Sequence, residues 1–401
     1  MDDGNLKEDL EKYTRQGLQR KEILSFVERD FSDYPWSLRT LDRRLRHFGI
    51  YRTDPNVTVE ELITAVQEEL DGPGKDLGYR AMHNKIRQVH ELNVPRHKVH
   101  NVMYELDPAG LENRALAKKA TRVKGKFTTR GTNWVHSFDG HAKLMGCQRD
   151  TFPLAIYGCI DTASRKILWL RIWTSHSNPK LIGRWYFDYL YDTKTIAAMI
   201  RIDKGTETGT LATLHAFLRR HHNDMDPMNT VIYGPSTDNQ IERWWRELHE
   251  RLEQFYKHHL KYLKDQGYYN PQDQTDRMLL AYLFIPLLQH ELDTFRETIW
   301  NTHRIRKQDA FLPNGVPDHI YGFPEEYGLE ECGWEVTGEQ LREAAFHSGV
   351  LDVGEDYLDQ DFRARCEAIL PDPTEVKPKD CVDAFLYLKE HFHAASQTST
   401  S

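Results

Sequence analysis

The chain has 401 residues, of which 39 % are hydrophobic and 28 % charged, a composition typical of a globular protein with several domains. It has no apolar run of about 18 residues, the length that spans a membrane. Its polar start contains no apolar signal segment. The five cysteines form no CxxC pair. We therefore expect an intracellular protein without a membrane partner, nuclear if the source is a eukaryote.

The net charge of −8 is unevenly distributed along the chain. Residues 309–401 hold 6 Lys and Arg against 20 Asp and Glu, so this region carries −14. The preceding residues carry +6 and remain able to approach nucleic-acid phosphates. We treat 309–401 as a separate acidic C-terminal region to which the sequence assigns no chemistry.

The first predicted module covers residues 1–55. A helix at 20–31 is followed by a break at Pro35 and by a second helix in SLRTLDRRLRHFG. One face of the second helix is apolar and the opposite face is basic. The apolar face holds Leu38, Leu41, Leu45 and Phe48, and the basic face holds Arg39, Arg43 and Arg46. Two short helices joined by a tight break, the second amphipathic and rich in arginine, predict a helix-turn-helix that binds DNA.

Residues 56–110 repeat this pattern without repeating the sequence. Helical periodicity covers 59–70, the segment GYRAMHNKIRQVH and the segment VPRHKVHNVMYEL. The predicted outward side chains in these segments are Arg80, His83, Arg87, Arg96, His97, His100 and Asn101. Arg80, Arg96 and Lys98 are the candidate DNA contacts of this second helix-turn-helix-like module. An ordinary helical bundle with solvated basic faces would show the same pattern.

Residues 111–130 hold seven basic residues and one acid. This composition predicts a basic linker able to lie along a phosphate backbone. A merely solvated connector is the alternative interpretation.

Residues 131–308 have the pattern of an α/β domain. Three strands are predicted in succession, at WVHSFDGH, LAIYGCID and RKILWLRIWTS. A helix, a strand (TIAAMIRID), a second helix, a strand (NTVIYG) and a long helix starting near Ser236 follow. The order β-β-β-α-β-α-β-α predicts a mixed five-stranded sheet flanked by helices, which is the order of an RNase H-like fold.

Three acids in this domain are expected to converge. Asp139 lies near the end of the first strand, Asp203 ends the fourth, and Glu242 lies in the first turns of the long helix. Strand ends and the loops after them gather at one edge of such a sheet. The apolar stripe Ile241, Trp245, Leu248, Leu252 and Phe255 would bury the helix against the sheet, and Ser236 or Thr237 would cap it. Each acid alone would more often be a cap or a solvated residue.

Clustered carboxylates suit phosphoryl-transfer chemistry. Two Mg²⁺ ions about 4 Å apart can activate the attacking oxygen and stabilise the leaving one. Magnesium prefers oxygen ligands and keeps several waters, so two or three carboxylates are enough. Without metal the acids would raise one another's pKa values, and we expect a loose or partly protonated site.

The motifs WVHSFDGH, YGCIDTASRKILW, RIDKGTETG and YGPSTDNQIERWWREL resemble the integrase core domain of retroviral-type integrases and DDE transposases. The resemblance is strong over 135–250 and looser over 18–110. It implies that Asp139, Asp203 and Glu242 are the catalytic and metal-binding triad. The 39 residues between Asp203 and Glu242 are close to the spacing that names the D,D-35-E pattern. Asp161 matches an acidic position that the family does not use for catalysis.

Several features depart from the family pattern. Lys204 stands where many members have Asn, and no His-His-Cys-Cys zinc module is present. The C-terminal region is acidic where integrases carry a basic barrel. The histidine pairs 221–222 and 258–259 suggest a metal only superficially, because adjacent histidines on a helix point apart.

The resemblance implies a DNA integrase or transposase that processes DNA 3′ ends and transfers strands with two Mg²⁺ or Mn²⁺ ions and no small-molecule cofactor. Asp139 and Asp203 would bridge the ions and Glu242 would hold one. Lys143, Lys204 and Arg243 are further candidate phosphate contacts. The implied partners are double-stranded DNA, as element ends and as target, and further copies of the chain. A domesticated, transposon-derived nuclear DNA-binding protein without transposition activity is one alternative, and a nuclease of the same fold is another.

Overall fold

A computed structural model describes residues 3–116, 129–146, 151–234, 240–306, 312–354 and 356–398. The chain divides into two compact units. Unit 1 comprises the described residues within Met1–Thr128 and Thr294–Gly328, and unit 2 those within Thr129–Asp293 and Leu329–Ser401. Among the described residues, no helix is long and apolar enough to cross a membrane.

Unit 1 is built from helices. They are α1 (Asp3–Arg15), α2 (Arg20–Asp30), α3 (Leu38–His47), α4 (Val59–Asp71), α5 (Tyr79–Gln88), α6 (Arg96–Leu106), α7 (Pro108–Leu116) and α13 (Pro317–Gly322). The helices predicted in both modules are confirmed, while α1 lies before the predicted elements. α7 covers the start of the predicted basic linker, and residues 117–128 of that linker lie outside the described residues.

The first three helices share one apolar core. Leu41 and Leu45 of α3 are buried in the same core cluster as Leu6 and Leu10 of α1, as the amphipathic pattern of α3 predicts. Ser37 begins α3 by accepting a hydrogen bond from the backbone N–H of Thr40. Leu38 is exposed, so the apolar face of α3 is narrower than its sequence indicates.

Helices α4, α5 and α6 share a second core, which includes Leu62, Met82 and Val99. The predicted outward orientation of two side chains on α5 is wrong. Arg87 is only 6 % exposed and donates to the backbone carbonyl of Thr14. His83 is 7 % exposed, and its Nε2 lies 2.8 Å from the carbonyl oxygen of Val94. Tertiary contacts therefore remove both side chains from the basic surface.

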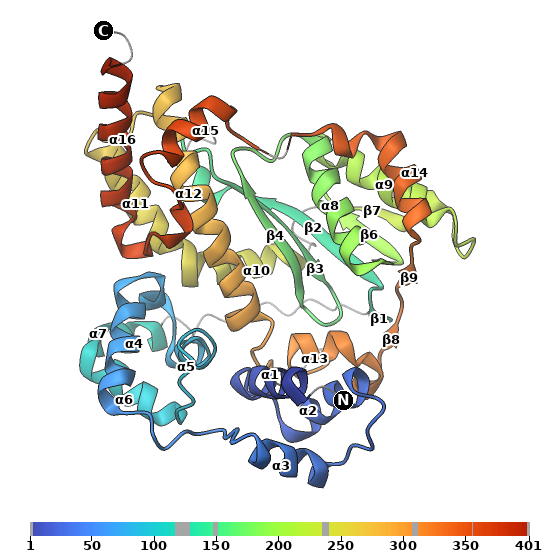
Figure 1. Ribbon diagram of the computed structural model, residues 1–401. Helices are drawn as coiled ribbons and strands as arrows, with labels where there is room; N and C mark the ends of the chain where they lie inside the picture. The colour runs from blue at the N-terminus through green and yellow to red at the C-terminus, as the bar shows by residue number, and fades with distance from the viewer. Residues whose placement is uncertain are drawn as a thin grey trace. The chain divides into compact units, whose positions relative to one another are not determined.

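Unit 2 contains the predicted sheet and its helices (Figure 1). The sheet strands are β2 (Val135–His141), β3 (Ala155–Asp161), β4 (Ile167–Trp173), β6 (Met199–Ile202) and β7 (Val231–Tyr233). The helices are α8 (Pro179–Thr193), α9 (Gly209–Arg219), α10 (Gln240–Leu248), α11 (Gln254–Asp265), α12 (Gln274–Thr294), α14 (Gly338–Ser348), α15 (Gln360–Glu367) and α16 (Cys381–Thr398).

The five strands are ordered β4-β3-β2-β6-β7. β2 is antiparallel to β3 and parallel to β6, so it lies at the centre, where the meander meets the α/β part. Alternate side chains of β2 point to opposite faces. Phe138 packs against Tyr186 of α8, whereas Asp139 contacts Trp245 of α10. α8 and α10 therefore cover opposite faces of the sheet.

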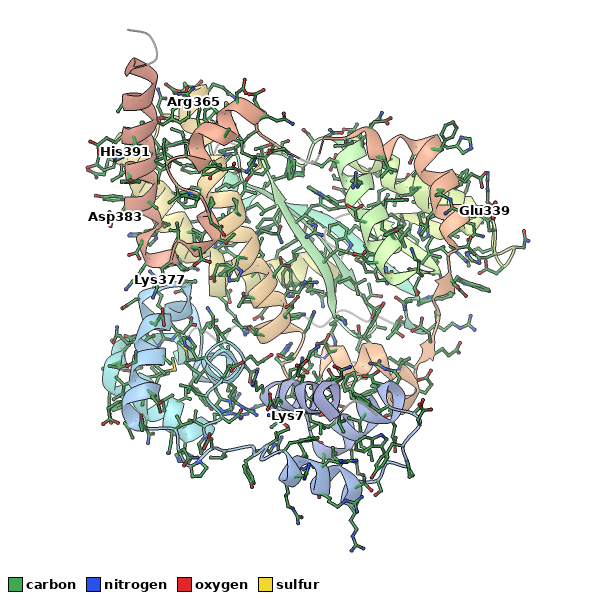
Figure 2. All side chains as sticks on the ribbon, in the orientation of Figure 1. Lys7, Glu339, Arg365, Lys377, Asp383 and His391 are labelled. Carbon is green, nitrogen blue, oxygen red and sulfur yellow. The ribbon has the colours of Figure 1, made fainter. Side chains whose placement is uncertain are left out.

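The acidic C-terminal residues add to unit 2. β8 (Glu330–Glu331) pairs with β1 (Gly131–Thr132), and β9 (Trp334–Glu335) pairs with β5 (Thr195–Ile196). Lys389 of α16 forms an ion pair with the buried Asp276 of α12. Figure 2 labels Glu339 on α14, Arg365 on α15, and Asp383 and His391 on α16, and these charged or polar side chains are exposed.

A mixed five-stranded sheet with flanking helices, in a chain that starts with an all-helical region, is the predicted fold class. The structure confirms the RNase H-like core and the preceding helices. The predicted domain boundaries at 55, 110, 130 and 308 remain predictions.

Candidate active site

Asp139 lies at the fifth position of β2, with 6 % of its surface exposed. Its Oδ2 accepts a hydrogen bond of 3.0 Å from the indole Nε1 of Trp245. Gly158 pairs with Asp139 across β3. A Cβ at Gly158 would come within 3.1 Å of the Trp245 ring and 2.6 Å of Leu170, so the glycine allows α10 to approach the sheet.

Asp203 directly follows β6, the parallel neighbour of β2. Ser137 pairs with Arg201 in this ladder, and two residues further along each strand Asp139 is level with Asp203. The Asp203 Oδ1 accepts a 3.3 Å hydrogen bond from the backbone N–H of Gly205. This bond is the Asp-x-Gly turn that the sequence indicates, and it positions the carboxylate at the end of the strand.

Glu242 lies in the first turn of α10, and its side chain is exposed. The predicted apolar stripe is confirmed, because Ile241, Trp245, Leu248, Leu252 and Phe255 are all buried. The stripe holds α10 against the sheet with Glu242 at its border. The predicted caps Ser236 and Thr237 lie outside the described residues.

The three acids interact. Burial raises the pKa of Asp139 to about 8, with further contributions from the charge of Glu242, a hydrogen bond to Glu242 and the charge of Asp203, while the Trp245 hydrogen bond opposes the rise. The carboxyl groups of Glu242 and Asp203 therefore lie near enough to Asp139 for their charges to act on it.

Carboxylate oxygens are the ligands that Mg²⁺ and Mn²⁺ prefer, so the donor set suits a divalent cation. Within the described ranges, however, no three His, Cys, Asp or Glu side chains are grouped tightly enough to hold a metal ion as they stand. The exposed Glu242 has the rotamer freedom to move, whereas the buried Asp139 does not. The residues fit a cation chemically, and Glu242 would have to adjust.

A second set of polar side chains supports Trp245. The Trp245 ring stacks on His141, with centroids 4.6 Å apart and planes at 15°. The His141 Nε2 lies 2.8 Å from Glu253, which also contacts the Nδ1 of His249 at 3.0 Å. Although burial raises it, the pKa of Glu253 is lowered overall by hydrogen bonds to the two histidines.

Glu253 ends a π-helical turn, His249–Glu253, which joins α10 to α11. The sequence shows Trp245 and Glu253 only as helix residues. Because their partners come from β2, more than 100 residues earlier, no local pattern could predict this arrangement.

The predicted DNA contacts are exposed in both units. In unit 1 they are Arg39, Arg43, Arg46, Arg80, Arg96 and Lys98, and in unit 2 they are Lys143, Lys204 and Arg243. Lys204 follows Asp203 and Arg243 follows Glu242, so two cations flank the acids. The structure holds no nucleic acid, and these assignments remain predictions.

Residues 127–320 match the family model of the integrase core domain. The match includes all three acids and every strand of the central sheet. The chain therefore carries an integrase core domain, consistent with the superfamily of retroviral-type integrases and DDE transposases. No curated protein matches the chain.

Proposed function

We propose that the protein is a metal-dependent polynucleotidyl transferase that cuts and joins DNA, with Asp139, Asp203 and Glu242 as its catalytic acids. The observation that carries the proposal is the convergence of these acids in an integrase core domain. Asp139 within β2 and Asp203 directly after β6 are level with each other in the parallel ladder, and the charge of Glu242 on α10 acts on Asp139.

Two divalent ions, Mg²⁺ or Mn²⁺, would be held by the carboxylates of Asp139, Asp203 and Glu242. Bound divalent ions supply charge stabilisation for both the attacking and the leaving oxygen of an in-line displacement. The proton that the raised pKa of Asp139 favours would have to leave before a cation binds, because a ligating carboxylate is ionised.

The proposed reaction consists of two displacements at phosphorus. In the first, water attacks a phosphodiester at a DNA end, the bond from phosphorus to the 3′ oxygen breaks, and a 3′ hydroxyl is released. In the second, this hydroxyl attacks a target phosphodiester, so one ester bond forms as another breaks. Asp139, fixed by Trp245, and Asp203, fixed by its turn, would orient the reacting phosphate, and Lys143, Lys204 and Arg243 would contact neighbouring phosphates.

The helical modules of unit 1 would recognise DNA. Their six exposed Arg and Lys side chains lie on helices whose apolar faces form two separate cores. Exposed cations on an amphipathic helix are suited to phosphate and base contacts in a groove. Because two DNA ends must be joined to one target, we propose that the active form is a homo-oligomer, in the nucleus if the source is a eukaryote.

The test is a strand-transfer assay with labelled duplex DNA from the ends of the encoding locus, in Mg²⁺ and in Mn²⁺. We expect joined products from the native chain and none from Glu242→Ala. Cleavage without joining would indicate a nuclease. DNA binding without metal-dependent chemistry would contradict the proposal and favour a domesticated DNA-binding protein.

A further inference from the structure

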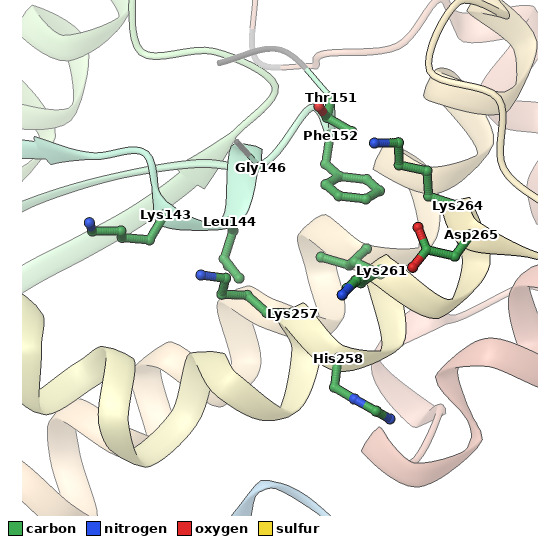
Figure 3. A pocket seen from close by; sticks show the side chains of 11 residues that line it. Lys143, Leu144, Gly146, Thr151, Phe152, Lys257, His258, Lys261, Lys264 and Asp265 are labelled. Carbon is green, nitrogen blue, oxygen red and sulfur yellow. The ribbon is translucent and has the colours of Figure 1, made fainter. Parts of the chain in front are cut away.

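A pocket of about 310 Å³ lies in unit 2 beside the end of β2 (Figure 3). Lys143, four residues after Asp139, lines one side, and α11 lines the other with Lys257, Lys261 and Lys264. The three lysines of α11 are spaced four and three residues apart, so they lie along one helix face. His258 points away from the other labelled side chains in this view.

The pocket has a rigid apolar floor. Leu144 and Leu260 are 1 % exposed, and Phe152 is 6 % exposed. Phe152 stacks on Tyr269 with centroids 5.2 Å apart, and the Tyr269 hydroxyl donates to the carbonyl oxygen of Thr151 at 2.7 Å. A floor held in this way keeps its shape when the pocket is filled.

The rim carries an excess of positive charge. Four lysines surround the floor, with Asp265 as the acidic member of the lining. The side-chain ammonium groups of the four lysines have no ion-pair or hydrogen-bond partner among the residues that the structure describes. Neighbouring ammonium groups repel each other, and an anion between them would relieve the repulsion. The pocket therefore suits a ligand with an apolar body and several negative charges at its rim.

A nucleotide has this chemistry. We propose that the pocket binds a nucleotide unit of the DNA strand that the protein processes, with phosphates on Lys257, Lys261 and Lys143 and the sugar or base against the floor. The inference rests on the proposed function, since it takes the ligand to be the DNA substrate. Single-stranded segments are bound elsewhere by this combination of basic rim and apolar or aromatic surface.

The location fits a strand that leaves the proposed active site. Lys143 follows β2, the strand of Asp139. On the other side, α10, the π-helical turn and α11 run without interruption from Glu242 to Lys257. At 1.5 Å per residue these two positions are about 22 Å apart along the helix, a span of roughly six nucleotide steps at 3.4 Å each.

The first experiment compares the full-length native chain with Lys257→Ala/Lys261→Ala. Alanine preserves α11, because it is the strongest helix former. The matched control is Arg171→Ala/Lys180→Ala, which removes two exposed charges of unit 2 outside the pocket. Binding of a fluorescent oligothymidylate is measured at several salt concentrations, and thermal unfolding reports on the fold.

Removing two phosphate contacts should reduce the slope of log affinity against log salt by about 1.4 and weaken binding roughly 25-fold at 0.1 M salt. The control and Lys257→Arg/Lys261→Arg should bind like the native chain. Equal slopes for the alanine variant and the native chain, with unchanged unfolding, would overturn the proposal.

A second measurement separates the DNA strand from a free nucleotide. Thymidine monophosphate is titrated calorimetrically against the native chain and the alanine variant. A large loss of monophosphate binding with no change in oligonucleotide binding would identify a free-nucleotide site and contradict the assignment to DNA.

Glu242→Ala separates the pocket from the catalytic proposal. It should abolish strand transfer and leave the salt slope unchanged. If strand transfer persists in Glu242→Ala while the pocket variant loses oligonucleotide binding, the catalytic proposal fails and the pocket proposal stands.

Discussion

Two aspartates are buried on neighbouring strands of the sheet, and their surroundings differ. Asp161, at the end of β3, is fully buried and accepts hydrogen bonds from the backbone N–H groups of Asn133 and Ser164 and from the Ser164 hydroxyl. Burial raises the pKa of Asp161 to about 6 against the effect of these donors. Asp139 has Trp245 as a donor and two acidic neighbours, and the same cause raises its pKa to about 8.

The comparison shows that burial alone does not indicate a functional carboxylate. Asp161 closes a turn with its oxygens satisfied, which is a structural role. Asp139 is kept next to Glu242 and Asp203, where like charges make the ionised form costly unless a cation is present. Substitutions at the two positions should therefore have different consequences for activity and stability.

The largest expected effect is that of Asp139→Asn on chemistry. Loss of a metal-binding carboxylate removes several kcal/mol of transition-state stabilisation, so strand transfer should fall by about a thousandfold or more. Unfolding by urea should show an intact fold. Asp188→Asn, at a half-buried acid on α8 that pairs with Arg184, is the control. A rate within tenfold of the native chain would exclude Asp139 from catalysis.

The second effect is on the pH dependence of stability without divalent metal. Both carboxyl groups have pKa values above the ordinary 3.8, so the folded state binds the proton more tightly than the unfolded state. The free energy of unfolding therefore falls as the pH rises from the ordinary pKa to the pKa of the folded state. This pH range ends near pH 8 for Asp139 and near pH 6 for Asp161.

Relative to the native chain, Asp139→Asn should gain stability up to about pH 8, at no more than about 1.4 kcal/mol per pH unit. For Asp161→Asn the gain should stop near pH 6. Urea unfolding from acidic to alkaline pH measures both profiles. Parallel profiles for the two variants would contradict the difference between the sites.

A third effect is on stability at neutral pH. Asp161→Ala leaves the buried donors of Asn133 and Ser164 without an acceptor, and each such loss costs about 1–3 kcal/mol. We expect the free energy of unfolding to fall by about 3 kcal/mol. Unfolding in urea at pH 7 measures the change. An unchanged midpoint would show that water replaces the carboxylate.

The smallest expected effect is that of Trp245→Phe. The ring still stacks on His141, but the donor to Asp139 is lost. Since this hydrogen bond lowers the pKa of Asp139, its removal should shift the acidic limb of the pH–activity profile to higher pH and reduce the rate at neutral pH about tenfold. Trp244→Phe, the buried neighbour, should leave the profile in place. A slower enzyme with an unshifted profile would assign Trp245 a structural role only.

Much of this architecture is predictable from local patterns. The segment WVHSFDGH and the apolar runs at 154–161 and 167–173 predict the three strands of the meander, and the 3.6-residue period predicts α3 and α10. The spacing of Asp139, Asp203 and Glu242 within a known order of elements predicts that the acids approach one another. The strands and helices depend on residues close together in the chain, and the order of these elements places the three acids, which is why the sequence alone predicts both.

Contacts between distant segments were decided only in three dimensions. The acidic C-terminal region adds β8 and β9 to unit 2, and Arg87 turns inward to the carbonyl of Thr14. Trp245 donates a hydrogen bond to Asp139, and Lys143 lines one pocket together with the lysines of α11. An amphipathic pattern predicts that the apolar face of a helix is buried, but it does not indicate which segment packs against that face. That choice depends on shape, charge and hydrogen-bonding partners that come together only when the whole chain packs.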